Sequence, residues 1–364
     1  MALVPSLMFL NIRVSSPSIT FLSVLSTLGT SCPHLQDVIV KIPSAADNLI
    51  HKISPFLAQP ISQLNNLHSL AIWDLGNQGI EHIMQLQTLQ SLTLDLRVAS
   101  SVEPYLQFPG FHGSNLLCLI AYALDDISNF LSSLQVVRSK EINVRLMPSR
   151  PSNSGSTMLS QFFAVLQERC DSDILESFTF VDLSSKAPVQ LDVFTPLHAY
   201  CNLTKLYISR DHDISISDEE LSHLVKAWPK LEALTLSGYI FIDGITVPTF
   251  HGLFSLLRLC PALTTLSLVI DTTKLDGIDL QCPGGGICNK NLKDLVLGNS
   301  CIESPLNVAL ILSSIFPHLE RVGLNCWGLA PIISPEELSA IEQWRLVNSF
   351  LYGFGVVRKR GVVE

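Results

Sequence analysis

Residues 228–236 read WPKLEALTL and combine the end of a helix with the start of a regular apolar pattern. Pro229 ends a helix, because the residue before a proline is pushed out of the helical region. Leu231, Leu234 and Leu236 then follow with the spacing Leu-x-x-Leu-x-Leu. The same helix end and leucine start recur in the tetrapeptides CPHL, CPAL and FPHL. The stretch therefore predicts one unit of a repeat, in which a helix is followed by a short strand.

The leucine spacing recurs along the whole chain, with Ile, Val, Phe or Ala at some positions. A weaker unit is expected at Ile142-x-Val144-x-Leu146. Most units are about 27 to 32 residues apart, close to the upper end of the roughly 20 to 29 residues of leucine-rich repeats. The sequence predicts an α/β leucine-rich-repeat solenoid, a curved horseshoe of strand–helix units with a parallel sheet on its concave face. The first positions of the other units are Leu7, Leu35, Leu67, Leu89, Leu116, Leu175, Leu203, Leu231, Leu263, Leu292 and Leu319.

Helices are predicted between the strands. Ser217 and Glu220 form a capping box, in which each side chain satisfies a backbone N–H at the start of a helix. Apolar residues then share one helical face in several units. A stripe of this kind cannot be buried by one unit alone, so the units are expected to stack. The stripes are Phe21, Val24, Leu25 and Leu28; Leu221, Leu224, Val225 and Trp228; Phe250, Leu253, Phe254 and Leu257; and Val308, Ile311, Leu312 and Ile315.

The expected organisation is one repeat array followed by a cap. Residues 1–330 are predicted to form about eleven to twelve irregular repeats, with residues 147–157 as a polar insertion. Residues 331–364 are predicted to form a C-terminal capping helix and tail, because solenoids need atypical terminal units. The helix would start at Ser334-Pro335-Glu336-Glu337 and close the last repeat with Leu338, Ile341, Trp344 and Leu351.

Composition narrows the classes of partner. The formal charge of −9 argues against nucleic acid, whose binding rests on clustered Lys and Arg. No apolar run reaches the roughly 18 to 20 residues of a membrane span, so no membrane partner is expected. Most of the nine cysteines lie in apolar segments and are interpreted as buried, reduced thiols. A cytoplasmic or nuclear location is predicted.

Two stretches are candidate chemical sites. CPGGGIC, residues 282–288, could be a phosphate loop, a metal clip or a flexible connector that replaces a helix. The connector is favoured, because the glycines lead into a strand and a second pair of ligands is missing. Asp211-His212-Asp213 resembles an acid–base or metal set, but no nucleophile motif lies near it. The sequence predicts no enzyme activity, no cofactor, no catalytic residues and no metal site.

A surface for protein recognition is the remaining prediction. In a repeat strand the leucines point inward and the residues between them point to the exposed sheet face. Both signs of charge and a few aromatic residues on that face suit a protein substrate or partner. The predicted protein-binding residues on the concave face are Asp37, Trp73, Asp95, Tyr122, Arg145, Lys205, Tyr207 and Arg321.

One segment near the C-terminus resembles a known family. Asn291-Leu292-x-x-Leu295-x-x-Gly298-Asn299-Ser300, then Ile302, Pro305 and Ile315-Phe316-Pro317-x-Leu319, is similar to the leucine-rich-repeat region of basidiomycete fungal F-box proteins. The Trp344 helix with Arg358-Lys359 resembles the C-terminal end of those proteins. The resemblance implies a substrate-receptor part of a ubiquitin-ligase adaptor, in which an F-box binds the Skp adaptor and a cullin.

The chain departs from that family at its start. It has no Leu-Pro-x-Glu-Leu segment of the F-box kind, and Met1 begins almost inside a repeat. Either the F-box has been lost or the sequence is truncated, so Skp adaptor and cullin are expected only if an F-box lies upstream. Two alternatives stay open beside the ligase adaptor. They are a repeat regulator of a GTPase, using Arg13, Arg145 or Arg321, and a stand-alone scaffold.

Overall fold

The computed structural model of the protein describes residues 4–13, 19–41, 57–73, 75–98, 107–148, 156–182, 189–210, 214–237, 246–297, 300–324 and 335–361. The chain divides into two compact units, Met1–Ser184 and Ser185–Glu364, and each is described by itself. The predicted division between residues 330 and 331 stays a prediction.

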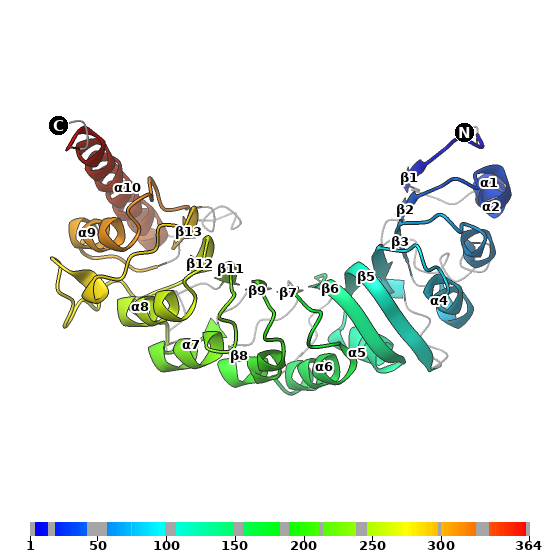
Figure 1. The fold of residues 1–364 in the computed structure, drawn as a ribbon, viewed down its shortest axis with the longest axis horizontal. Coiled ribbons are helices and arrows are strands. Elements are labelled where there is room, and N and C mark those ends of the chain that lie inside the picture. Colours follow the sequence, from blue (N-terminus) through cyan, green and yellow to red (C-terminus); the bar gives the residue numbers. More distant parts are fainter. Residues whose placement is uncertain are drawn as a thin grey trace. The chain divides into compact units, whose positions relative to one another are not determined.

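Unit 1 is a parallel sheet whose strands pair in the order of the sequence. Parallel neighbours need a connection that returns along the sheet, and short helices provide most of them. In Figure 1 these helices lie on one side of the strands. The elements are β1 (Phe9–Arg13), α1 (Ile19–Ser26), α2 (Leu28–Ser31), β2 (Asp37–Lys41), β3 (Ser69–Trp73), α4 (Gly76–Met84), β4 (Ser91–Asp95), η2 (Leu96–Val98), β5 (Phe108–Ala121), α5 (Leu124–Ser132), β6 (Leu134–Leu146), α6 (Ser156–Arg169) and β7 (Ser177–Asp182).

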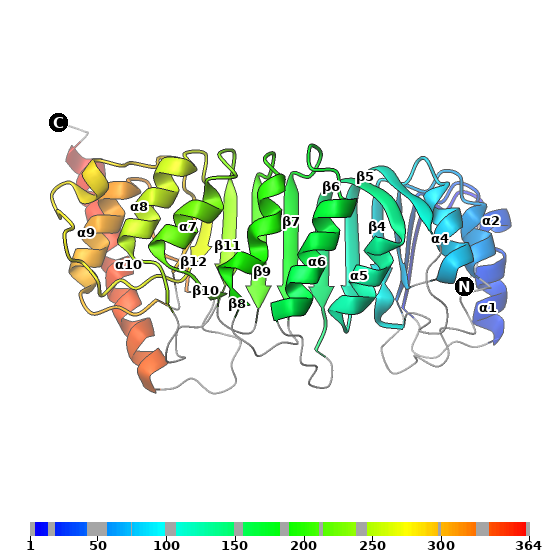
Figure 2. The same cartoon turned by 90° about the horizontal axis from the view of Figure 1, so that it is seen from below.

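Unit 2 repeats the same plan with a smaller sheet, in which β9, β11, β12 and β13 pair in parallel. Strands β8 and β10 form a separate parallel pair. Figure 2 shows helices α7 to α9 side by side along one side of the strands. The elements are β8 (Val189–Gln190), η3 (Leu191–Ala199), β9 (Lys205–Arg210), β10 (Ile214–Ser215), α7 (Asp218–Val225), β11 (Ala233–Ser237), α8 (Phe250–Leu259), β12 (Thr265–Leu268), η4 (Pro283–Gly285), β13 (Asp294–Val296), α9 (Pro305–Ile315) and α10 (Pro335–Gly361).

The strand register follows the leucine frame. In unit 2 the second leucines of four successive units stand opposite one another, namely Leu206, Leu234, Leu266 and Leu295. All four are buried, because strand alternation points them at the helices. The predicted fold class, an α/β leucine-rich-repeat array with a parallel sheet, is confirmed.

The frame was wrong at one unit. Leu92 pairs with Leu117, not with Leu119, so the unit predicted to start at Leu116 is shifted by two residues. Ser114 takes the place of the first leucine, directly after a register shift in the pairing of β5 with β6. These two strands are 14 and 13 residues long, far longer than their neighbours. The backbone ladder, rather than a complete set of leucines, fixes the register here.

The last predicted unit, at Leu319, forms no strand and contributes only a bridge between Gly323 and Val296. Asn348 on α10 explains the end of the ladder. Its amide accepts from the Val322 N–H at 2.7 Å and donates to the Val322 carbonyl at 3.0 Å. Both backbone groups of Val322 are therefore satisfied without a further strand.

The helix end that precedes each proline is a shared structural device. Cys32, Cys260 and Phe316 all leave the helical region, with φ between −121° and −136° and ψ between 62° and 78°. The amide two residues after each proline then bonds the carbonyl of the residue before it, at 3.2 Å from Leu263 to Cys260 and 3.0 Å from Leu319 to Phe316. A tight turn thus connects the helix to the start of the next unit, as predicted.

The predicted helix start at Ser217 is also confirmed. The Glu220 N–H donates to Ser217 Oγ at 3.2 Å, and the Ser217 N–H donates to Glu220 Oε2 at 2.7 Å. The following stripe, Leu221, Leu224 and Val225, is buried. The stripes on α8 and α9 are buried as well, so each helix packs its apolar face onto the strands.

Helix α10 closes unit 2 against α9. Trp344 is fully buried, and its indole N–H donates to the Ser300 carbonyl at 2.9 Å. Leu351 is buried too, whereas Leu338, predicted to help close the last repeat, is 51% exposed. Of the described helices, none is long and apolar enough to cross a membrane.

Candidate protein-binding surface

The strands of each unit present one side that their helices do not cover. In Figures 1 and 2, α4 to α6 lie on one side of the strands of unit 1, and α7 to α9 lie on one side of those of unit 2. We call the opposite side of the strands in each unit its open face. On β4 it is formed by Ser91, Thr93 and Asp95, which are half-buried and alternate with buried leucines.

The best-defined polar group on the open face of unit 1 joins two predicted residues, Asp95 and Tyr122, through Arg97. Arg97 Nε lies 2.8 Å from Asp95 Oδ1, and Arg97 Nη2 lies 2.5 Å from Asp95 Oδ2. The guanidinium carbon also lies 5.6 Å from the centre of the Tyr122 ring. A two-point ion pair stacked on an aromatic ring holds all three side chains in one arrangement.

The side chains of this group are partly buried from solvent. The Arg97 and Asp95 side chains are 19% and 23% exposed. The hydrogen bond to Asp95 is the main cause that raises the pKa of Arg97 above its ordinary value, so the guanidinium stays charged. Sequence reasoning missed Arg97. The available signal was an acidic and a basic residue two positions apart at the end of a strand, where both can meet on one face.

Arg145, another predicted residue, is exposed on β6 and pairs in register with Ile120 and Val181. Cys118, on the adjacent strand, faces the same side and is mostly buried. Burial raises the pKa of the Cys118 thiol, and the positive charge of Arg145 acts in the opposite direction. Cys118 is therefore a neutral, buried thiol, which is a poor nucleophile.

Trp73 does not lie where the sequence placed it. It was predicted as an exposed binding residue, but only 2% of it is exposed. Strand alternation does point it away from Ile72, yet β3 packs against η2, the short turn that follows β4. A large ring at the end of the strand is therefore covered. Asp37, the first residue of β2, is half-buried.

In unit 2 the open face carries Lys205 and Tyr207 on β9. Lys205 is exposed, and Tyr207 is 41% exposed, which is high for a tyrosine within a sheet. The residues opposite them on β11 are Ala233 and Thr235. Small side chains beside a tyrosine and a lysine leave both free to reach a partner.

Arg321 is exposed, but it lies outside the strand ladder. It directly precedes Val322, whose backbone is bonded by Asn348 on α10. The sequence placed it on the concave face, because a twelfth strand was expected there. The bridge from Gly323 to Val296 keeps the register of the frame, with Arg321 two positions before Gly323, so the place of Arg321 on the concave face stays a prediction.

The CPGGGIC stretch forms the predicted connector. Residues 271–293 contain one 3₁₀ turn, η4, and no α-helix. Gly284, Gly285 and Gly286 have φ of 61°, 69° and 83°, a left-handed region that suits glycine. Buried Asn289, which the sequence did not single out, anchors the loop. Its amide donates to the Leu263 carbonyl at 3.0 Å and accepts from the Leu292 N–H at 3.0 Å.

The remaining chemical candidates add no site within the described ranges. There, no three His, Cys, Asp or Glu side chains gather as metal ligands, and Asp211-His212-Asp213 lies outside the described residues. The eight described cysteines are free thiols. Burial raises the pKa of Cys260 to about 11. Cys201, predicted to be buried, is exposed in the turn before β9.

Comparison with known proteins identifies no family for the chain. No protein-family model matches the chain, and no curated protein matches its sequence. One similar solved structure is titled as the crystal structure of the Rad7 and Elc1 complex in yeast. The chain is 14% identical to it, the match covers 90% of this chain and 79% of that one, and the TM-score is 0.41. A similarity at this level does not identify the function.

Proposed function

We propose that the chain is a non-enzymatic protein-recognition scaffold that binds a protein partner on the open face of its strands. The observation that supports this most is the set of side chains that each unit presents on its open face. Unit 1 offers the exposed Arg145 and an ordered Asp95–Arg97–Tyr122 group, and unit 2 offers the exposed Lys205 and Tyr207. Aromatic and arginine side chains on a fixed support are the usual anchors of protein interfaces.

The finer form of the proposal is a substrate receptor of the F-box ubiquitin-ligase type, in the cytoplasm or nucleus. It rests on the resemblance of residues 291–319 to the repeat region of fungal F-box proteins. In this form an F-box upstream of the repeats recruits the Skp adaptor and a cullin, and the open face holds the substrate. Nucleic acid and membranes are not proposed as partners, because the chain carries a net charge of −9.

Affinity capture with matched variants tests the scaffold. Lys205→Glu combined with Tyr207→Ala changes two exposed residues of the open face, and Lys226→Glu makes the same charge change at the end of α7 on the helix side. The proposal predicts that the wild type and Lys226→Glu capture the same set of proteins. Quantitative mass spectrometry should show that the double variant captures less of each of them. Equal capture by all three proteins would contradict it.

The ligase form has its own readout. If it holds, the captured proteins include a Skp-type adaptor and a cullin, and their amounts do not change in the open-face variant, because they bind elsewhere. Capture of open-face partners without either component would leave a scaffold with no ligase link.

A further inference from the structure

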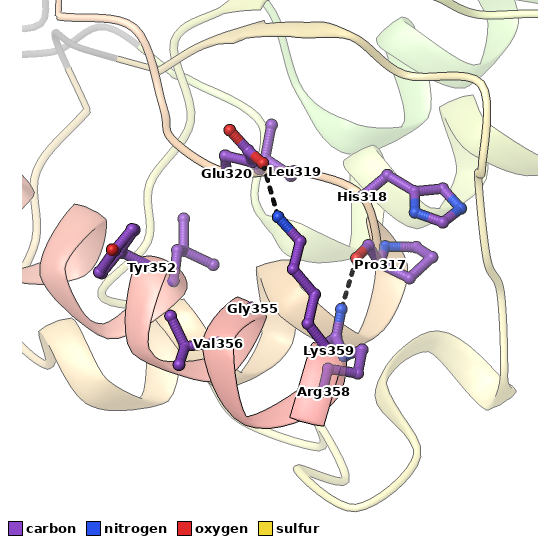
Figure 3. Close-up of a pocket in the computed structure, with 10 residues that line it drawn as sticks. Pro317, His318, Leu319, Glu320, Tyr352, Gly355, Val356, Arg358 and Lys359 are labelled. Atoms are coloured by element: carbon purple, nitrogen blue, oxygen red, sulfur yellow. Dashed lines mark hydrogen bonds and ion pairs between the residues drawn. The ribbon is translucent and has the colours of Figure 1, made fainter. Parts of the chain in front are cut away.

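A pocket of about 540 Å³ lies between the last turns of α10 and the segment that follows α9. Figure 3 shows Tyr352 and Val356 on α10, and Leu319 and Glu320 on the facing segment. Leu319 and Leu351 are nearly buried, at 7% and 2% exposed, whereas Tyr352 is 69% exposed. The size falls within the roughly 300 to 1,000 Å³ of sites that take small ligands or anchoring side chains. We call this the α10 pocket.

The walls of the α10 pocket are tied together by Arg358. Its guanidinium donates to the Pro317 carbonyl and to the Ser313 carbonyl, the latter at 3.0 Å. Both carbonyls lie near the end of α9, where a cation is stabilised by the helix dipole. Because these contacts and the buried Trp344 fix α10 against α9, the pocket exists before any ligand binds.

The rim of the α10 pocket carries two cations, Arg358 and Lys359, and one carboxylate, Glu320. Arg358, Lys359 and Arg360 follow one another in the last turn of α10, within a chain whose net charge is −9. Lys359 Nζ lies 3.2 Å from Glu320 Oε1, and the two side chains are 78% and 79% exposed. An ion pair this exposed contributes little and is easily exchanged. A carboxylate from outside can therefore replace Glu320 as the partner of Lys359.

We propose that the α10 pocket binds an acidic peptide segment of a partner protein. One apolar side chain of the peptide enters beside Leu319 and Tyr352, and an adjacent carboxylate pairs with Lys359. The apolar lining does not suit a polynucleotide, and a second copy of this chain that docked symmetrically through the same site would bring the same cations to the rim. The site lies apart from the open-face residues Lys205 and Tyr207, so it stands or falls independently of the proposed function.

Fluorescence anisotropy with the full chain tests this site. The probe is a fluorescein-labelled acidic peptide, Asp-Glu-Leu-Phe-Glu-Asp. A basic peptide, with lysines in place of the acidic residues, serves as the comparison. The acidic peptide should bind, and its affinity should fall with added NaCl. Lys359→Glu and Tyr352→Ala should each weaken binding about tenfold. Glu320→Gln should strengthen it severalfold, because it releases Lys359 from its internal partner.

Two controls keep the result specific. Lys226→Glu makes the same charge change on α7 and should leave the affinity unchanged. Lys205→Glu with Tyr207→Ala should also leave it unchanged, which separates this site from the open face. Equal binding of the acidic and basic peptides, or a loss with Glu320→Gln as large as with Lys359→Glu, would overturn the proposal. So would binding of phosphatidylserine vesicles in place of the peptide, or a dimer that Tyr352→Ala abolishes.

Discussion

The repeats around α7 and α8 in unit 2 and the β5–β6 segment of unit 1 solve the same packing problem in different ways. After α7 and α8 a proline ends the helix, a leucine follows two residues later, and a strand of five or four residues begins. In unit 1 the two strands are 14 and 13 residues long, and a register shift precedes the inward-facing residues. In unit 2 the leucine side chains determine the strand register, whereas in the β5–β6 segment the backbone pairing determines it.

This difference teaches where a repeat can be located from sequence alone. Where all three leucines of the frame are present, only one register buries them, since a slip by one residue turns every side chain to the other face. A slip by two residues keeps the same face, so an incomplete frame leaves the register open. This is the error made at Leu116.

The regular repeats should be most sensitive at their largest buried side chain, Trp228. It is fully buried, and its indole N–H donates to the Leu197 carbonyl at 3.2 Å. Trp228→Ala is expected to lower the free energy of unfolding by about 3 to 5 kcal/mol, through the cavity and the lost bond. Urea denaturation followed by circular dichroism measures the loss. A change below about 1 kcal/mol would show that this repeat is not packed as described.

The β5 register gives the next largest effect and tests the irregular segment directly. Leu117 is fully buried and pairs with Leu92, whereas Leu116 is half-buried on the open face. Leu117→Ala should cost about 2 to 5 kcal/mol, and Leu116→Ala less than about 1 kcal/mol. The same denaturation experiment compares the two variants. The reverse order would restore the frame that starts at Leu116.

The connector before β13 brings an irregular segment into unit 2, and Asn289 is its expected anchor. Asn289→Ala leaves the Leu263 carbonyl and two backbone amides without their bonds, at a cost of about 1 to 3 kcal/mol. Cys282→Ser and Cys288→Ser should change stability by less than about 0.5 kcal/mol, because both are exposed. Thermal melts with and without EDTA complete the test. A melting temperature lowered by EDTA, or by either Cys→Ser substitution, would support a metal site instead.

The smallest expected effect is on the pH dependence of stability, and it involves η3. This 3₁₀ helix takes the place of an α-helix next to the regular α7. The ring centre of His198 on η3 lies 5.3 Å from that of His223 on α7. Burial, and then the nearby His223, lower the pKa of His198 below its ordinary value. The unfolded chain therefore binds this proton more tightly, and the free energy of unfolding should fall as pH drops below about 6.5.

Replacing His198 isolates that contribution. His198→Gln should flatten the decrease of stability between about pH 7 and pH 5, measured as urea midpoints across the range. An unchanged slope would mean that His198 does not titrate with folding.

Much of the fold could be predicted from the sequence, and less of the surface. The leucine frame placed most strands within two residues, and Ser217, Glu220 and Pro229 gave helix bounds, because each rests on local chemistry. Trp73 was misplaced because alternation says which side a residue faces, but not that η2 packs against its strand. Arg97 was missed because its importance depends on Tyr122, which follows β5 and lies far from Arg97 in the sequence.

Site-specific photocrosslinking tests the central claim, recognition on the open face, most directly. A photoreactive phenylalanine analogue replaces Tyr207 on the open face in one protein and Lys226 on the helix side in another. We predict that irradiation in extracts crosslinks a discrete partner at position 207 and not at position 226. A partner crosslinked only at position 226, or the same products at both positions, would contradict recognition on the open face.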